Sequence, residues 1–179
     1  MAGTRGKQSV RNMLQSLAVI GIAVAVIYMF VPHDDKKDPN VKAIDYRVEL
    51  LTARRAAPYP VAAPVGLPDE AKWKATSVTF DRQDNNAWHL GFLDPETEYV
   101  GIEQSSAPDR DKFVKSVAKK ATKTDHTQQI AGATWRRWEG SKYDALVRED
   151  KGSTTVVTGT ASFAQLEKVA AALELKKSS

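Results

Sequence analysis

Hydrophobic and polar positions divide this chain into short alternating segments and one long apolar run. The alternation has a period of two, which predicts half-buried β-strands. Six such segments are predicted strands: 74–81, 87–93, 98–104, 133–139, 143–149 and 154–159. A similar alternation at 44–50 predicts a further strand or an extended lead-in. Asp84-Asn85-Asn86 and Asp94-Pro95 are typical turn residues between the strands.

Two segments have the 3.6-residue period of amphipathic helices. The first, 109–123, has apolar residues on one arc and lysines opposite. The second is 162–173, where Ser162 and Gln165 form a capping-box pattern. Each helix follows three predicted strands. We therefore predict an α+β domain with an antiparallel sheet of about six to seven strands and two helices on one face, arranged as two β-β-β-α units.

Residues 52–70 are rich in proline, and the prolines are Pro58, Pro60, Pro64 and Pro68. Proline lacks a backbone N–H, so this composition predicts extended, polyproline-like backbone and not a helix interior or a sheet ladder. The apolar residues between the prolines favour a strap that packs across the domain. The alternative is that Tyr59, flanked by prolines, docks into a partner.

The long apolar run, residues 13–31, contains no charged side chain. As a helix its 19 residues would span about 28 Å, close to the hydrocarbon thickness of a bilayer. Arg5, Lys7 and Arg11 precede it without any acidic residue, and mixed charges follow it. By the positive-inside rule, this pattern predicts a transmembrane signal anchor with a cytoplasmic N-terminus.

The anchor divides the chain into four predicted parts. Residues 1–12 are a basic cytoplasmic tail, 13–31 the anchor, 32–43 a stalk, and 44–179 an extracytoplasmic α+β domain that includes the strap 52–70. The alternatives are a buried core helix and a signal peptide cleaved near Ala23-Val24-Ala25. Cleavage there would expose an apolar new N-terminus, so we expect the anchor to be retained.

The charge and cysteine counts exclude several function classes. The 179 residues contain no cysteine, which excludes disulfides, thiolate metal sites and a cysteine nucleophile. The net charge is +4, but three basic residues and no acidic residue precede Pro32, so the exported part carries only +1. Such a balance argues against a nucleic-acid partner. Neither a metal nor a cofactor is predicted.

Trp135-Arg136-Arg137-Trp138 is the strongest candidate for an interaction surface. Exposed Trp and Arg side chains are typical of binding hot spots and form cation–π contacts. The predicted interaction surface therefore consists of Trp135, Arg137, Trp138 and Tyr59. The competing interpretation buries one tryptophan in the core, places the other over a sheet edge and leaves the arginines in solvent.

No catalytic residue is predicted, because the common nucleophile, metal and phosphate motifs are absent from the sequence. His89 is the best candidate for a catalytic base, but it would need a nucleophile or a carboxylate, for which Asp84, Asp94 and Ser105 are available. The lysines of 109–123 are interpreted as the solvated side of a helix, with anionic headgroups as the alternative partner.

Several blocks of the sequence resemble a known family, in order and at similar spacings. The blocks are Ala57-Pro58-Tyr59-Pro60-Val61, Leu67-Pro68, Trp73-Lys74-Ala75-Thr76-Ser77-Val78, Trp88-His89-Leu90-Gly91-Phe92 and Tyr99-Val100-Gly101-Ile102-Glu103-Gln104. The chain resembles the actinobacterial, membrane-anchored family called domain of unknown function 4245. This resemblance implies a single-pass protein of a Gram-positive cell envelope. It implies no activity and no site residue.

These observations favour a non-catalytic, membrane-tethered domain that binds another component of the cell envelope, with a protein as the expected partner. One alternative is a carrier or sensor of a small or lipidic ligand, held in an apolar cavity between the sheet and its helices. The other alternative is a hydrolase that uses His89.

Overall fold

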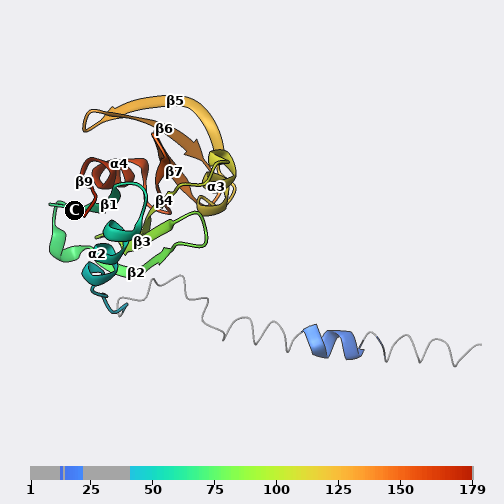
Figure 1. Ribbon diagram of the computed structural model, residues 1–179. Coiled ribbons are helices and arrows are strands. Elements are labelled where there is room, and N and C mark those ends of the chain that lie inside the picture. The colour runs from blue at the N-terminus through green and yellow to red at the C-terminus, as the bar shows by residue number, and fades with distance from the viewer. Residues whose placement is uncertain (1–12, 14, 22–40, 179) are drawn as a thin grey trace, which may run out of the picture. The chain divides into compact units, whose positions relative to one another are not determined.

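The computed structural model describes residues 13, 15–21 and 41–178 (Figure 1). Residues 1–38 and 39–179 form two separate units. In the first unit, residues 13 and 15–21 are helical. No helix of the described residues is long and apolar enough to cross a membrane. The remainder of the predicted anchor 13–31, the tail 1–12 and most of the stalk 32–43 lie outside these residues.

The second unit is an α+β domain, as predicted. Its helical elements are α2 (Arg47–Ala56), the short 3-10 helix η1 (Glu70–Lys72), α3 (Arg110–Val117) and α4 (Phe163–Ala171). Its strands are β1 (Val61–Pro64), β2 (Lys74–Asp81), β3 (Ala87–Leu93), β4 (Tyr99–Ser105), β5 (Thr122–Ile130), β6 (Ala133–Glu139), β7 (Asp144–Asp150), β8 (Ser153–Gly159) and β9 (Leu173–Lys176). Each of the six strands predicted from alternation is present, with bounds within one residue of those expected.

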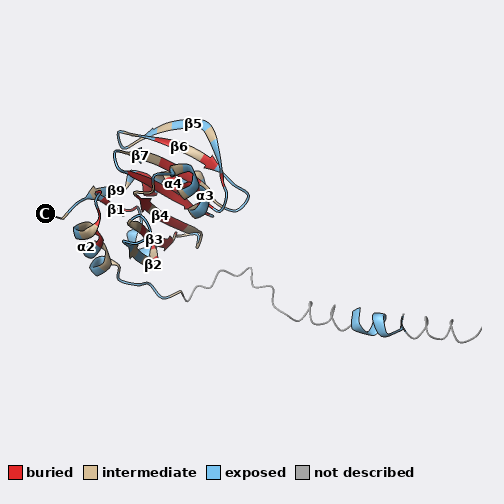
Figure 2. Cartoon of the chain, turned by 45° about the vertical axis from the view of Figure 1, so that its right-hand side comes forward, coloured by how far each residue is buried: buried red, intermediate tan, exposed pale blue. Residues whose placement is uncertain are grey.

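Seven strands form one antiparallel sheet in the order β2-β3-β4-β8-β7-β6-β5. The chain thus runs through β2-β3-β4-α3 and later through β6-β7-β8-α4, and the last strands of the two series, β4 and β8, pair at the centre of the sheet. Strand β5 was not predicted, because its sequence TKTDHTQQI shows no apolar alternation. It is an edge strand whose residues are mostly exposed (Figure 2).

The two helices lie on opposite faces of the sheet, so the prediction that they share one face is wrong (Figure 1). Helix α4 packs through Leu166 in a cluster that contains Val157 of β8. Helix α3 packs through Val114 in a second cluster that contains the next residue, Val156. Successive side chains of a strand point to opposite faces. Both faces of β8 are therefore apolar, and each is buried by a helix.

Residues 44–50 were predicted as a strand or an extended lead-in, but α2 begins at Arg47 and ends at Ala56. Tyr46, Leu50, Ala53 and Ala57 recur at helical spacing and pack against the cluster of α4. The prediction of extended backbone for all of 52–70 is also wrong in its first part, because the first proline comes only at Pro58. A segment without proline keeps every backbone donor that a helix needs.

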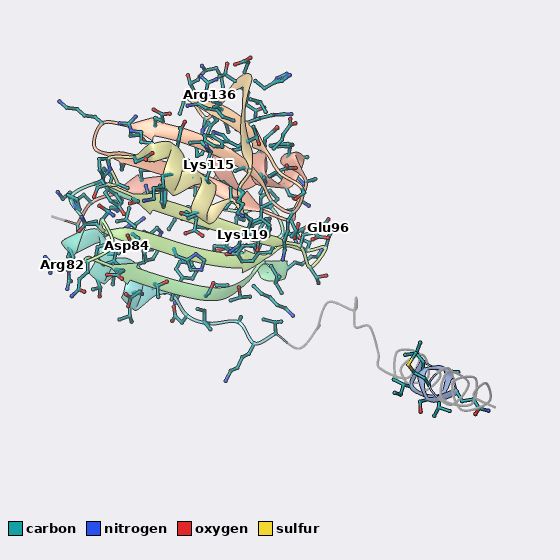
Figure 3. The ribbon with its side chains drawn as sticks, turned by 90° about the vertical axis from the view of Figure 1, so that its right-hand side faces the viewer. Arg82, Asp84, Glu96, Lys115, Lys119 and Arg136 are labelled. Carbon is teal, nitrogen blue, oxygen red and sulfur yellow. The ribbon has the colours of Figure 1, made fainter. Side chains whose placement is uncertain are left out.

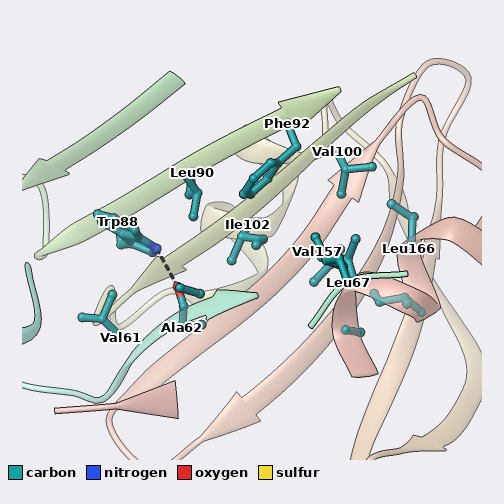
Figure 4. Packing of buried hydrophobic residues seen from close by; sticks show 14 of the residues in the cluster. Val61, Ala62, Leu67, Trp88, Leu90, Phe92, Val100, Ile102, Val157 and Leu166 are labelled. Carbon is teal, nitrogen blue, oxygen red and sulfur yellow. Dashed lines mark hydrogen bonds between the residues drawn. The ribbon is translucent and has the colours of Figure 1, made fainter. Parts of the chain in front are cut away.

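The rest of the proline-rich segment is bonded to the sheet by buried side chains. Trp88 donates its indole N–H to the carbonyl oxygen of Ala62 at 3.0 Å (Figure 4). Gln104, fully buried on β4, accepts from the Ala62 N–H at 2.7 Å and donates to Pro60 O and to Thr155 Oγ1. Strand β1 also pairs with β9. A buried amide with all its bonds made holds this segment in one register.

Helix α3 is shorter than predicted. Asp109 caps its start by accepting from the Lys112 N–H at 3.0 Å. The helix ends at Val117, and Lys119 and Lys120 then adopt left-handed backbone with φ of 50° and 69°. Left-handed residues end a helix. The chain then enters β5 at Thr122. Helix α4 starts as predicted, with Ser162 accepting from the Gln165 N–H.

Candidate functional site

The predicted Trp/Arg surface is not formed. Trp135 and Trp138 are each 1 % exposed and Tyr59 is 2 % exposed. The two tryptophans are three residues apart on β6, so they point to opposite faces of the sheet. Trp135 is in the cluster of α4 and Trp138 in the cluster of α3. Because a helix covers each face, the prediction of an exposed tryptophan platform is wrong, and so is the competing one of a tryptophan over a sheet edge.

Arg137 and Tyr59 bind within the domain. The Arg137 guanidinium donates to Glu167 Oε1 on α4 at 2.8 Å and to Gln128 Oε1 on β5, and lies 4.5 Å from the ring centre of Phe163. It therefore connects β6 to its neighbours and is half-buried. The Tyr59 hydroxyl donates to the backbone oxygen of Asn86. Of the four predicted residues, Trp135 and Arg137 share a face.

A different part of the surface brings polar and titratable side chains together. Helix α3 covers the β6-β7-β8 half of its face, and in Figure 3, which looks onto that face, no other described helix or strand lies over β2 and β3. Register places Thr79, His89 and Glu103 side by side on β2, β3 and β4 of this uncovered half. Ser77, two residues before Thr79, points to the same face.

His89 joins Ser77 and Glu103 in one hydrogen-bonded chain. Its Nε2 lies 2.7 Å from Ser77 Oγ, and its Nδ1 lies 2.7 Å from Glu103 Oε1. A carboxylate can only accept, so Nδ1 carries a proton, and in the neutral ring Nε2 then accepts the Ser77 hydroxyl proton. The side chains of His89 and Glu103 are 28 % and 12 % exposed. We call Ser77, His89 and Glu103 the polar chain.

A β-bulge places Ser77 in the polar chain. The register of β2 against β3 shifts between Ala75, which pairs with Phe92, and Ser77, which pairs with Gly91. Ala75 points into the core, so strict alternation would send Ser77 to the core as well. The extra residue at the bulge turns Ser77 to the other face. Bulges commonly redirect a side chain next to a functional site.

Two glycines make room beside the polar chain for the ring of Tyr99. Gly91 and Gly101 are cross-strand partners. A Cβ at Gly91 would collide with Ser77 Oγ and lie 3.1 Å from the Tyr99 hydroxyl, and a Cβ at Gly101 would lie 2.9 Å from that hydroxyl and 3.0 Å from Glu103 Oε1. The Tyr99 hydroxyl therefore lies beside both Ser77 and Glu103. Any larger residue at these positions would push the polar side chains apart.

The surroundings change the protonation of His89 and Tyr99. The hydrogen bond that His89 donates to Glu103 raises the pKa of His89 above its ordinary value of 6.5, against the opposing effect of burial. Burial, together with the Glu103 charge, raises the pKa of Tyr99. Tyr99 therefore keeps its proton at neutral pH and can donate a hydrogen bond. Its ring stacks at 5.7 Å on Tyr143, above which Lys119 lies at 5.9 Å.

The stability of the domain should depend on pH through the pair of His89 and Glu103. The raised pKa of His89 means that its stabilising contribution is complete below pH 6.5 and is lost as pH rises through the folded value. Glu103→Gln should therefore cost about 1 kcal/mol at pH 5.5 and less at pH 8. The measurement is urea unfolding of both chains across this range.

Other titratable groups on this face include Lys74 and Asp81 on β2 and Tyr99 on β4, and Asp81 accepts from backbone N–H groups in its own turn. Asp81→Asn serves as the control. A difference between wild type and Glu103→Gln that stays constant from pH 5.5 to pH 8 would contradict the assignment to His89.

The cavities elsewhere in the domain include a shallow one of about 640 Å³ that is lined by Asp109, Arg110 and Glu149. Another, of about 370 Å³, separates the turn at Asn85 from α3 and is lined by Ser105, Lys112 and Phe113. A smaller one of about 180 Å³ is lined by Tyr46, Glu70, Trp73 and Phe92, and this volume is below the roughly 300 Å³ at which pockets for drug-sized ligands begin. Within residues 13, 15–21 and 41–178, no group of three His, Asp or Glu side chains could hold a metal.

The comparison with protein families agrees with the resemblance noted in the sequence. A family model described as "Protein of unknown function (DUF4245)" matches residues 5–173. The chain belongs to the DUF4245 family. No curated protein matches it. The match begins before the apolar run 13–31 and ends after α4.

In the structure of this DUF4245 chain, the partners of His89 are not the residues that the sequence suggested. Asp94 is 2 % exposed and accepts from the N–H groups of Glu96 and Glu98 within its own turn. Ser105 donates to Asn85 O. Glu103 could have been found, because a hairpin between the predicted strands 87–93 and 98–104 places it opposite His89. Ser77 could not, since its position depends on the bulge.

Proposed function

We propose that this chain is a single-pass membrane protein that binds another component of an actinobacterial cell envelope through the uncovered half of its sheet. Residues 13–31 anchor it, the N-terminus lies in the cytoplasm, and the α+β domain lies outside. The basic residues before the uncharged run support this orientation. The family match supports an anchor that belongs to the conserved unit, because it includes the run.

The observation that carries the binding proposal is the uncovered half-face of β2, β3 and β4. It presents hydrogen-bonding groups that no described element covers, whereas the opposite face of the same strands is core. Beside it lies Lys115 of α3 (Figure 3). Lys112, Lys115 and Lys120 are exposed, and their ammonium groups form no ion pair within the described residues. This favours a protein partner with carboxylates opposite the lysines.

Site-directed photo-crosslinking in growing cells of the native host tests the binding surface. Thr79, exposed on β2 beside His89, is replaced by a photoreactive phenylalanine, and Lys168, exposed on α4 on the other face, serves as the matched position. We expect one protein adduct from position 79 and none from position 168. The adduct should weaken with Lys112→Glu and Lys115→Glu. Adducts of equal yield from both positions, or from neither, would contradict the proposal.

The absence of cysteine gives a direct test of topology. Lys168→Cys and Gly3→Cys each introduce a single thiol into the chain. A membrane-impermeant maleimide added to intact cells should label the thiol at position 168, and should label the thiol at position 3 only after lysis. Labelling in the reverse order would overturn the proposed orientation.

A further inference from the structure

Beyond binding, we propose that the polar chain is an acyl-transfer site in which Ser77 is the nucleophile, His89 the general base and Glu103 a positioning residue. Its substrate would be a carboxylic ester. This inference does not rest on the proposed partner, because it concerns the reactivity of the purified chain alone.

The connectivity of the three residues supports this role. A serine nucleophile needs a base within about 2.6–3.2 Å, and the base needs a third group that orients it. Here Ser77 Oγ lies 2.7 Å from Nε2, and Glu103 lies 2.7 Å from the other ring nitrogen. Each imidazole nitrogen therefore has one partner of the required type, with the proton on Nδ1 and the lone pair of Nε2 directed at the hydroxyl.

The site is accessible to a substrate. Strand β2 is the outermost strand at its end of the sheet, and Ser77 and Thr79 lie on its uncovered face. His89 is 28 % exposed. Ser77 does not line any of the cavities described above, so the ester is expected to be presented by a larger molecule that lies on the face. A small activated ester can still report the chemistry.

Tyr99 supplies a donor for the charge that forms during attack. Its hydroxyl and Ser77 Oγ both lie close to the space above Gly91, where a Cβ would meet them. A tyrosine hydroxyl can stabilise an oxyanion when it remains protonated, and burial keeps Tyr99 in that form. Because Gly91 has no Cβ, both groups can approach this position together.

The steps balance in atoms and protons. Ser77 Oγ forms a bond to the ester carbonyl carbon while its proton passes to His89 Nε2. The resulting oxyanion collapses, the bond from carbon to the alcohol oxygen breaks, and that oxygen takes the proton from Nε2. Water then attacks the acyl-Ser77 ester and gives a proton to Nε2, which returns it to Oγ as the carboxylic acid leaves.

The test uses the full chain in mild detergent with a fluorophosphonate probe and 4-nitrophenyl acetate. We expect covalent labelling at Ser77, identified by mass spectrometry of the peptide, and none in Ser77→Ala. His89→Ala should slow labelling by about 100-fold or more, as expected for a general base. His126→Ala, which changes an exposed histidine on β5 away from this face, is the matched control and should label at the wild-type rate.

The positioning role of Glu103 has its own readout. The wild-type labelling rate should rise with pH through a value above 6.5, because only the neutral imidazole accepts a proton. Glu103→Gln should move this midpoint to lower pH, and Glu103→Asp should restore part of the rate. No labelling of the folded wild-type chain, labelling at another residue, or a Ser77 rate unaffected by His89→Ala would each overturn the proposal.

Discussion

Replacing Trp135 with alanine should destabilise the domain by about 3–5 kcal/mol, the range measured for large buried aromatics. Trp135 is 1 % exposed and lies in the cluster that contains Leu146 of β7 and Leu166 of α4. Its removal leaves a cavity between the sheet and α4 that neighbouring side chains can fill only in part. Urea unfolding of the full chain, followed by circular dichroism, measures the loss.

Two comparisons make this result decisive. Val65→Ala removes an apolar group from a side chain that is 59 % exposed, and should change the free energy of unfolding by less than about 0.5 kcal/mol. Arg137→Ala removes a partly exposed ion pair and should cost about 1 kcal/mol. A loss below 1 kcal/mol for Trp135→Ala would mean that this side chain lies on an accessible surface after all.

The second large effect is expected from Gly159→Ala, at the centre of the sheet. A Cβ at Gly159 would overlap the backbone carbonyl of Tyr99 and lie 3.1 Å from Val100 Cα. The same carbonyl accepts the N–H of Thr160 at 3.0 Å, which holds the end of β8 against β4. Backbone cannot rotate away as a side chain can. We therefore expect a loss of about 3 kcal/mol or more, at or above the upper end for overpacked sites.

Thermal unfolding of Gly159→Ala should show this as a Tm lowered by roughly 6–12 °C, given about 2–4 °C per kcal/mol in chains of this size. The control is Gly132→Asn, because position 132 has open space around it and a φ of 78°, which asparagine tolerates. An unchanged Tm for Gly159→Ala would mean that β4 and β8 separate without cost. Because Tyr99 lies at this junction, the substitution should also disturb the polar chain.

The position of the polar chain is related to the packing of the two helices. Helix α3 covers the β6-β7-β8 half of its face, where Val147 and Val156 point toward the helix. On β3 and β4 the corresponding positions carry Gly91, His89, Gly101 and Glu103. These residues offer no apolar surface to a helix. The same sequence difference that leaves this half uncovered therefore supplies its chemistry.

The sequence by itself determined the strands that have a clear period of two. All six were predicted within one residue, since alternation is a local property of a half-buried strand. It also determined the helix starts at Asp109 and Ser162, because capping depends on residues within one turn. Strand β5 and helix α2 were not determined, as the first lacks apolar alternation and the second has a pattern that fits both periods at 44–50.

Only the tertiary structure decided on which face of the sheet each side chain lies and whether that face is covered. Whether Trp135 and Trp138 are exposed depends on which helix covers each side of β6, and no local pattern contains that information. The position of Ser77 beside His89 depends on a bulge that reverses the alternation of β2 after Ala75. Side-chain direction along a strand changes with every inserted residue. The candidate site therefore follows from strand register and layer packing, which are set by contacts between residues far apart in the chain.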